Sequence, residues 1–172
     1  MAVKARYFSI WAGIILLAAI AYGYRHELAG VKARVVAAFA PATGFQQASN
    51  AISFPASSDG HFYIRALVNG VPLIFLADTG ATHMVISPGD AEKLGLTPDR
   101  LRYDRVYETA NGVVRGSTIT IDDLEIGAFH MNDLMASVNE APMRNSLLGM
   151  NFFNRLASYQ VKADVLTLYW PQ

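Results

Sequence analysis

The sequence predicts an all-β domain with one or two short helices, preceded by an N-terminal transmembrane helix. Three observations support this fold class. Residues 7–24 form an apolar block without a formal charge. The chain after residue 53 consists mainly of short apolar runs of the length and pattern that β-strands show. Two of these runs end in Asn-Gly pairs, at Asn69-Gly70 and Asn111-Gly112, which favour two-residue hairpin turns.

The composition excludes several classes of protein. The chain of 172 residues carries 14 Lys plus Arg and 14 Asp plus Glu, so its net charge at pH 7 is zero. Nucleic-acid binding depends largely on clustered basic residues, and we therefore predict no nucleic-acid partner. Cysteine is absent, which excludes disulfides, thiolate nucleophiles and cysteine-based metal sites.

The N-terminal block is long enough to cross a membrane. As a helix, residues 7–24 would extend about 27 Å, close to the hydrocarbon thickness of a bilayer. Lys4 and Arg6 precede the block, which favours an inside N-terminus and an exported domain. A cleaved signal peptide is the alternative, because Ala19-Ile20-Ala21 matches the small-x-small cleavage pattern. We therefore expect three parts: a transmembrane anchor or signal segment over 1–24, a tether over 25–52 and one folded domain over 53–172.

Local patterns predict the elements of the domain in order. Residues 61–68 and 71–77 should form a hairpin, and its second strand should be buried because it is apolar on both faces. A short strand at 84–86 is followed by Ser87-Pro88-Gly89-Asp90, which is typical of a helix N-terminus with Ser as the cap, Pro at N1 and an acid at N3. Further elements are expected as strands at 106–109, 113–121, 124–126, 134–138 and 165–170, and as a short helix at 150–156.

Asp78 is the residue whose position most needs a physical explanation. It ends an apolar strand, where an ionised carboxylate is poorly solvated unless hydrogen bonds support it. Thr79 supplies a hydroxyl and Gly80 permits a sharp turn with inward-pointing amides, so this loop can hold a reactive carboxylate in a dry cleft. The alternative is an Asx-turn in which Asp78 only ends the strand. His83 follows shortly afterwards and is a candidate for tuning the local field.

Three segments, in order, resemble the retropepsin-like aspartic proteases, specifically their single-domain, membrane-tethered bacterial members. FLADTGAT resembles the active-site loop of that family, VYETANGVVRG resembles its flap hairpin, and NSLLGMNFFNRL resembles its hydrophobic-hydrophobic-Gly motif with the short helix that follows. This combination is far more specific than an Asp-Thr-Gly tripeptide alone. The resemblance implies a retropepsin-like acid-protease half-barrel with a flap hairpin over residues 53–172.

The resemblance also implies a role for each matched residue. Asp78 is the catalytic carboxylate. The remaining residues fall into three groups: the active-site loop of Thr79, Gly80 and Ala81; the substrate-binding flap of Thr109, Ala110, Asn111 and Gly112; and the loop support of Leu147, Leu148 and Gly149.

The chain carries one such motif, whereas hydrolysis by carboxylates needs two that share a proton. We therefore predict an aspartic endopeptidase that hydrolyses a polypeptide substrate with activated water, at a dyad formed across a homodimer and without a cofactor. The predicted location is the bacterial inner membrane, crossed once through residues 7–24, with the protease domain in the periplasm. The alternative is a non-catalytic, membrane-tethered dimerisation or peptide-binding module, because a fold does not guarantee activity.

A second group of acidic residues is assigned no function. Asp122, Asp123 and Glu125 suggest metal ligands, but neighbouring strand residues point to opposite faces and no histidine lies beside them in the sequence. We expect a solvated turn there and predict no metal site.

Overall fold

The computed structural model describes residues 39–109 and 112–171, together with residues 11, 15, 16 and 22. The chain divides into two compact units, Met1–Val36 and Ala37–Gln172. The described residues of the first unit are helical and exposed. None of the helices among the described residues combines the length and apolar character needed to span a bilayer. Most of the block 7–24, which we expect to be the membrane segment, lies outside the described residues.

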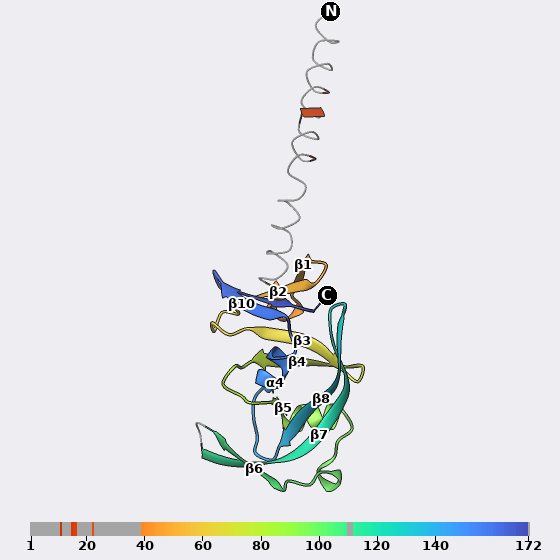
Figure 1. Ribbon diagram of the computed structural model, residues 1–172, viewed down its shortest axis with the longest axis vertical. Helices are drawn as coiled ribbons and strands as arrows, with labels where there is room; N and C mark the ends of the chain where they lie inside the picture. Colours follow the sequence, from red (N-terminus) through yellow and green to blue (C-terminus); the bar gives the residue numbers. More distant parts are fainter. Residues whose placement is uncertain (1–10, 12–14, 17–21, 23–38, 110–111, 172) are drawn as a thin grey trace, which may run out of the picture. The chain divides into compact units, whose positions relative to one another are not determined.

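The second unit contains two β-sheets and a few short helices (Figure 1). The smaller sheet is antiparallel, with strand order β1-β2-β11-β10. Its strands are β1 (Phe45–Ala48), β2 (Ala51–Pro55), β10 (Ser158–Lys162) and β11 (Val165–Tyr169), and a single 3-10 turn, η1 (Pro41–Thr43), precedes them.

The larger sheet has strand order β3-β4-β9-β5-β8-β7-β6. Strand β3 also pairs with β7, at Leu67↔Glu125 and Val68↔Leu124, so the sheet curls back on itself and β6 extends beyond this closure. The order places β9 between β4 and β5, with parallel pairing to β4. Its strands are β3 (Tyr63–Val68), β4 (Val71–Ala77), β5 (Met84–Ile86), β6 (Arg105–Thr109), β7 (Gly112–Ile126), β8 (Phe129–Asn139) and β9 (Ser146–Leu148).

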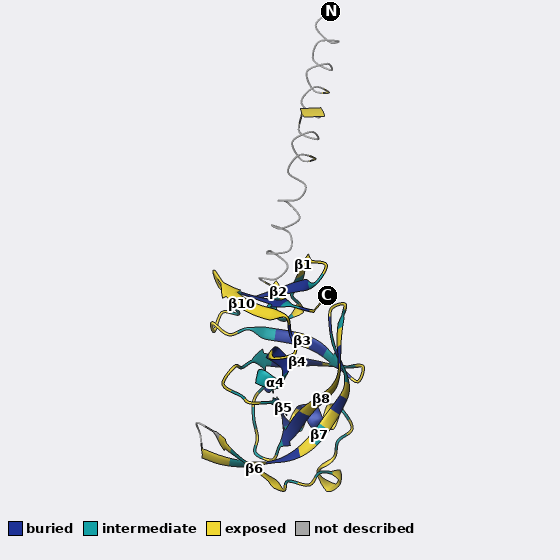
Figure 2. Cartoon of the chain, viewed as in Figure 1, coloured by how far each residue is buried: buried dark blue, intermediate teal, exposed yellow. Residues whose placement is uncertain are grey.

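Two short helices and a second 3-10 turn complete the domain: α3 (Pro88–Lys93), η2 (Pro98–Arg100) and α4 (Met150–Phe153). Helix α3 begins as its sequence predicts, because the Ser87 hydroxyl accepts a hydrogen bond from the Asp90 amide at 3.2 Å and Pro88 occupies the first helical position. One apolar core takes residues from both sheets and from α4, among them Phe54, Phe75 and Phe152, which are fully buried. Figure 2 shows buried segments on strands of both sheets.

The all-β prediction is confirmed, but several element boundaries are wrong. Strands β1 and β2 occupy part of the segment 25–52 that we expect to be a tether, and β2 is buried in the core. Residues 122–125 belong to the continuous strand β7 and do not form a turn. Strand β8 begins at Phe129, earlier than expected. Strand β10 is not predicted at all, because its five residues are all exposed and carry no inward apolar pattern (Figure 2).

Candidate active site

Asp78 is the first residue after β4, and its loop is fixed by the neighbouring strand β9. Ala77 is paired with Leu148 in the parallel β4–β9 ladder, and the Asp78 amide donates to the Leu148 carbonyl at 2.9 Å. The Gly80 amide donates to Asp78 Oδ1 at 2.8 Å. This bond orients the carboxylate, which is half-buried, while Thr79 and Gly80 are exposed. One oxygen of Asp78 is therefore held by the backbone of its own loop.

The other side of the loop is held by the start of α4. The Met150 amide donates to the Ala81 carbonyl at 2.8 Å, and the Asn151 amide donates to the Thr82 carbonyl at 3.1 Å. Gly149 is buried at this junction, and a Cβ placed on it would lie 2.7 Å from the Ala81 oxygen and 2.6 Å from the His83 carbonyl carbon. Because both atoms are backbone, the close approach requires glycine. Leu148 and Gly149, which the resemblance implies to support the loop, therefore lie in direct contact with it.

Asn151 links three elements around the site. Its side-chain oxygen accepts from the Met84 amide of β5 at 2.9 Å, and its side-chain nitrogen donates to the Met135 carbonyl of β8 at 2.7 Å. Sequence reasoning did not identify this residue. The feature of the sequence that could have identified it is a polar residue in the short helix that follows the Leu-Leu-Gly segment.

A buried polar group supports β9 from the side of α3. The Ser146 hydroxyl donates to Asp90 Oδ2 at 2.5 Å and accepts from the Ser87 amide at 3.0 Å. Lys93 Nζ lies 2.7 Å from Asp90 Oδ1. Burial raises the pKa of Asp90, but the hydrogen bonds from Lys93 and Ser146 outweigh it and hold the pKa below its ordinary value. The start of β9 is therefore bonded to the cap of α3.

The expected flap is a hairpin made by β6 and the beginning of β7, and it projects from the larger sheet (Figure 1). Thr109 ends β6 and pairs with Gly112, which has a positive φ of 108°. Ala110 and Asn111, the predicted flap tip, lie outside the described residues. Val106 and Val113 on this hairpin are exposed, at 62% and 68%.

His83 and Tyr107 connect the base of the flap to the sheet beside the Asp78 loop. The two rings lie with centroids 4.9 Å apart, and His83 Nε2 lies 3.0 Å from the hydroxyl of Ser137, which is buried. Burial lowers the pKa of His83, which favours the neutral imidazole. Gly116 leaves room for the Tyr107 ring, since a Cβ there would lie 2.8 Å from it. His83 thus acts as a contact between loop and flap, and Tyr107 is a site residue that the sequence did not reveal.

Two further acidic features of the sequence lie outside this loop. Asp59, which precedes Gly60 in a turn, accepts from the Tyr63 hydroxyl at 2.8 Å and from the His61 amide, and these bonds lower its pKa. Asp123 and Glu125 lie in β7 and form a group with His130 of β8. This is the one group of three potential metal ligands among the described residues, and no residue of the Asp78 loop belongs to it.

Comparison with known proteins identifies the family. Residues 64–155 match the family model described as "gag-polyprotein putative aspartyl protease". An uncharacterized protein of Rickettsia prowazekii (strain Madrid E) is 35% identical over 160 residues, covering 93% of this chain and 69% of the relative. An uncharacterized protein encoded in the cobV 5′ region of a Sinorhizobium species is 31% identical over 168 residues, covering 95% of this chain and 72% of the relative.

A solved structure gives the same result at the level of the fold. The crystal structure of a retropepsin-like aspartic protease from Rickettsia conorii superposes with a TM-score of 0.64 at 36% identity, covering 70% of this chain and 90% of that chain. The matched family region contains the β4 strand, the Asp78-Thr79-Gly80 loop, the flap strands and the segment from β9 into α4. With its loop geometry, its strand order and these relatives in agreement, the chain belongs to the retropepsin-like aspartic protease family.

Proposed function

We propose that this chain is an aspartic endopeptidase that hydrolyses peptide bonds as a homodimer, with Asp78 contributed by each of the two copies. The observation that carries the proposal is the fixed but half-exposed carboxylate of Asp78, oriented by the Gly80 amide on a loop that β9 and α4 hold from both sides. A single copy supplies one such carboxylate, and general acid–base hydrolysis at a carboxylate dyad needs two.

The exposed Thr79 and Gly80 leave the loop free to meet its two-fold equivalent. In an isologous contact, the same loop would face itself across the axis and bring the two Asp78 carboxylates together. Two carboxylates a few ångströms apart share one proton, because both cannot easily ionise. The dyad would then hold one acid and one base at once.

Each group has a defined part in the proposed reaction. The ionised carboxylate takes a proton from water as the water oxygen bonds to the peptide carbonyl carbon, and the protonated carboxylate donates its proton to the carbonyl oxygen. Collapse of the tetrahedral intermediate breaks the C–N bond as the carboxyl group that took the proton from water passes it to the leaving nitrogen. The other carboxylate takes back the proton from the former carbonyl oxygen, which restores the dyad. The shared proton makes the rate a bell-shaped function of pH, and two macroscopic values describe the pair.

The flap hairpin supports the choice of a polypeptide as substrate. Strands β6 and β7 carry the exposed side chains of Val106 and Val113 on a projecting hairpin, which suits contact with an extended chain. An extended substrate between flap and dyad would pair through its backbone while alternate side chains enter pockets. Contact of Tyr107 with His83 would couple the flap base to the Asp78 loop.

We further propose that the protein resides in the bacterial inner membrane, with a single span at residues 7–24 and the protease domain in the periplasm. The support is the uncharged apolar sequence of that block and the basic residues Lys4 and Arg6 before it. Confinement to a membrane would raise the local concentration of copies and favour the dimer.

Asp78→Asn in the full-length chain tests the catalytic proposal. We expect cleavage of an unfolded polypeptide by the native chain at acid pH, complete loss in Asp78→Asn, and unchanged cleavage in the control Asp99→Asn, where an exposed aspartate is altered in the same way. Sedimentation should show that the variant still dimerises. Cleavage that survives in Asp78→Asn, or a monomer that cleaves at the full rate, would refute the proposal. A verified dimer that cleaves nothing at any pH would identify the non-catalytic module instead.

A further inference from the structure

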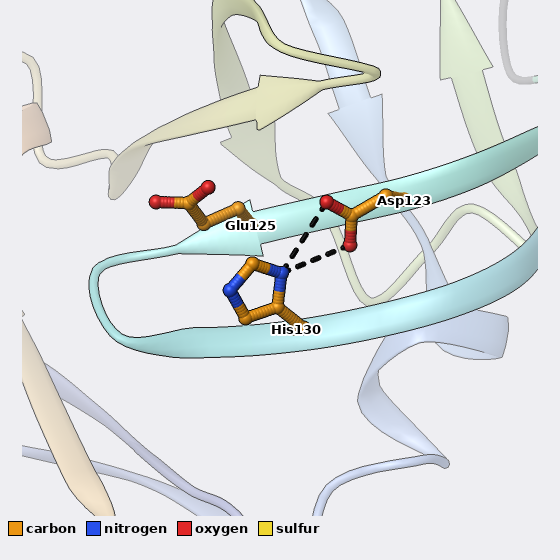
Figure 3. A group of neighbouring side chains, drawn as sticks. All are labelled: Asp123, Glu125 and His130. Carbon is orange, nitrogen blue, oxygen red and sulfur yellow. Dashed lines mark hydrogen bonds and ion pairs between the residues drawn. The ribbon is translucent and has the colours of Figure 1, made fainter.

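The β7–β8 hairpin carries an arrangement that the proteolytic reaction does not use. Asp123 and Glu125 are two residues apart on β7 and therefore share one face of the hairpin. His130 of β8 is the direct cross-strand partner of Glu125. Figure 3 shows the three side chains together, two from one strand and one from the other. We propose that Asp123, Glu125 and His130 form a binding site for a divalent transition metal ion, with Zn²⁺ as the expected occupant.

The spacing of the ligand atoms is close to that of a metal centre. One nitrogen or oxygen from each residue lies within 4.8 Å of the other two. His130 Nδ1 lies 3.0 Å and 3.3 Å from the two carboxylate oxygens of Asp123. Two ligands at about 2.0–2.1 Å from a tetrahedral Zn²⁺ are separated by about 3.3 Å. This pair therefore already has the required separation, whereas the Glu125 carboxylate, which lies within 4.8 Å of both, must turn toward them to become the third ligand.

The carboxylates are available for a metal. Asp123 and Glu125 are half-buried and His130 is exposed, so the ligand atoms are accessible without opening the core. Among the described residues, the side chain of Glu125 has no hydrogen-bond or ion-pair partner, although its backbone belongs to the β7–β8 ladder. A metal at His130 Nδ1 would replace the hydrogen bond to Asp123, and the single proton of the neutral ring would then sit on Nε2.

The backbone beneath the cluster is already ordered. The Asp123 amide donates to Asn69 Oδ1 at 3.0 Å, and the Asn69 amide donates to the Asp123 carbonyl at 2.8 Å. On the same hairpin, Phe129 stacks on Trp170 with ring centroids 4.2 Å apart. A metal would therefore meet ligands on fixed strands and would lose little conformational entropy in assembling them.

The donor set selects the class of metal. One imidazole with two carboxylates suits Zn²⁺ and similar borderline ions, whereas Ca²⁺ and Mg²⁺ prefer sites made of oxygen alone. Three protein ligands leave one tetrahedral position for water. Bound metal would cross-link β7 to β8 and so stabilise the folded chain, by an amount that rises with the logarithm of the free ion concentration once that exceeds Kd.

Calorimetric titration of the full-length chain with ZnCl₂, in metal-free buffer, tests the site. We expect saturable binding of one ion and a thermal midpoint that rises with the Zn²⁺ concentration. His130→Ala and the size-conserving Glu125→Gln should each weaken binding by roughly tenfold or more and abolish the thermal shift. Glu125→Gln keeps the test valid if His130→Ala fails to fold.

Two matched controls separate this site from general surface binding. Asp122→Ala removes the neighbouring exposed aspartate on the opposite face of β7, and His61→Ala removes an exposed histidine from another part of the domain. Both should bind Zn²⁺ like the native chain. Absence of saturable binding would overturn the proposal, as would equal losses in the controls and in the site variants. None of these readouts depends on proteolysis, so the result stands apart from the outcome of Asp78→Asn.

Discussion

Gly149→Ala should damage both the stability and the activity of the protein, although the change adds a single methyl group. Gly149 has ordinary backbone angles, φ −94° and ψ −175°, so an alanine meets no conformational strain there. The alanine methyl group instead has too little room between the Asp78 loop and α4. The new Cβ would lie 2.7 Å from the Ala81 oxygen and 2.6 Å from the His83 carbonyl carbon, whereas ordinary contact begins at 3.4 Å. Loop and helix must separate by about 0.7–0.8 Å at these atoms.

The energetic consequence follows from what that separation disturbs. Overpacking of a fixed junction costs about 1–3 kcal/mol. The two bonds from the α4 amides to the Ala81 and Thr82 carbonyls lengthen, and each contributes about 1 kcal/mol. We therefore expect a loss of about 2–4 kcal/mol in the free energy of unfolding. Since the same loop carries Asp78, a shift approaching 1 Å should also lower kcat/KM by about 10²-fold.

Urea unfolding followed by circular dichroism, together with cleavage kinetics, measures both effects. The midpoint should fall without a change in slope, as expected when stability alone is altered. Gly89→Ala is the matched control, because a Cβ at that position meets nothing within 4 Å and the glycine has no positive φ. We expect it to be neutral or slightly stabilising. A Gly149→Ala chain with native stability and native kcat/KM would refute the packing argument.

Two further changes test the contacts around the loop. Burial lowers the pKa of His83 below its ordinary 6.5, so the contribution of the neutral ring to stability is present above pH 6.5 and is lost as the pH falls through the folded pKa. In urea unfolding, His83→Gln, which keeps a partner for Ser137, should lose less stability on acidification than the native chain. An identical pH dependence of the two chains would contradict this assignment. Asn151→Ala leaves the buried Met84 amide without its acceptor and should cost about 1–3 kcal/mol. By contrast, Asn154→Ala, at the exposed C-cap of the same helix, should change the urea midpoint little.

The local parts of the fold were predictable because their signals lie within a few residues. The apolar run of β4 ends at Asp78, and the Ser87-Pro88 pair begins α3 through the expected cap. The two outer strands of the smaller sheet, β1 and β10, have no such local pattern in the sequence. Strand β10 is exposed along its whole length, and β1 is short and mostly exposed, so neither shows the alternation that marks a half-buried strand. Their positions are set by pairing with β11 and β2.

The residues of the candidate site also fall into those that short motifs predict and those that depend on contacts with distant strands. The Asp78 loop and the Leu148-Gly149 support were identified from short motifs. Asn151 and Tyr107 were missed because each acts through contacts with distant strands, Asn151 with Met84 and Met135, and Tyr107 with His83. Only the strand order places these segments together.

The cluster on the β7–β8 hairpin shows the physical origin of this limit most clearly. Asp122, Asp123 and Glu125 were set aside as ligands because neighbouring strand residues point to opposite faces and no histidine lies beside them. In the structure Asp123 and Glu125 share one face, and His130 pairs with Glu125 across the hairpin. Had the register been shifted by one residue, Phe129 or Met131 would stand in its place, because side chains alternate between faces. Whether the two acids form a metal site or a solvated surface is therefore decided by strand register. Loss of Zn²⁺ binding in His130→Ala, with retention in Asp122→Ala, would test that register as directly as it tests the metal.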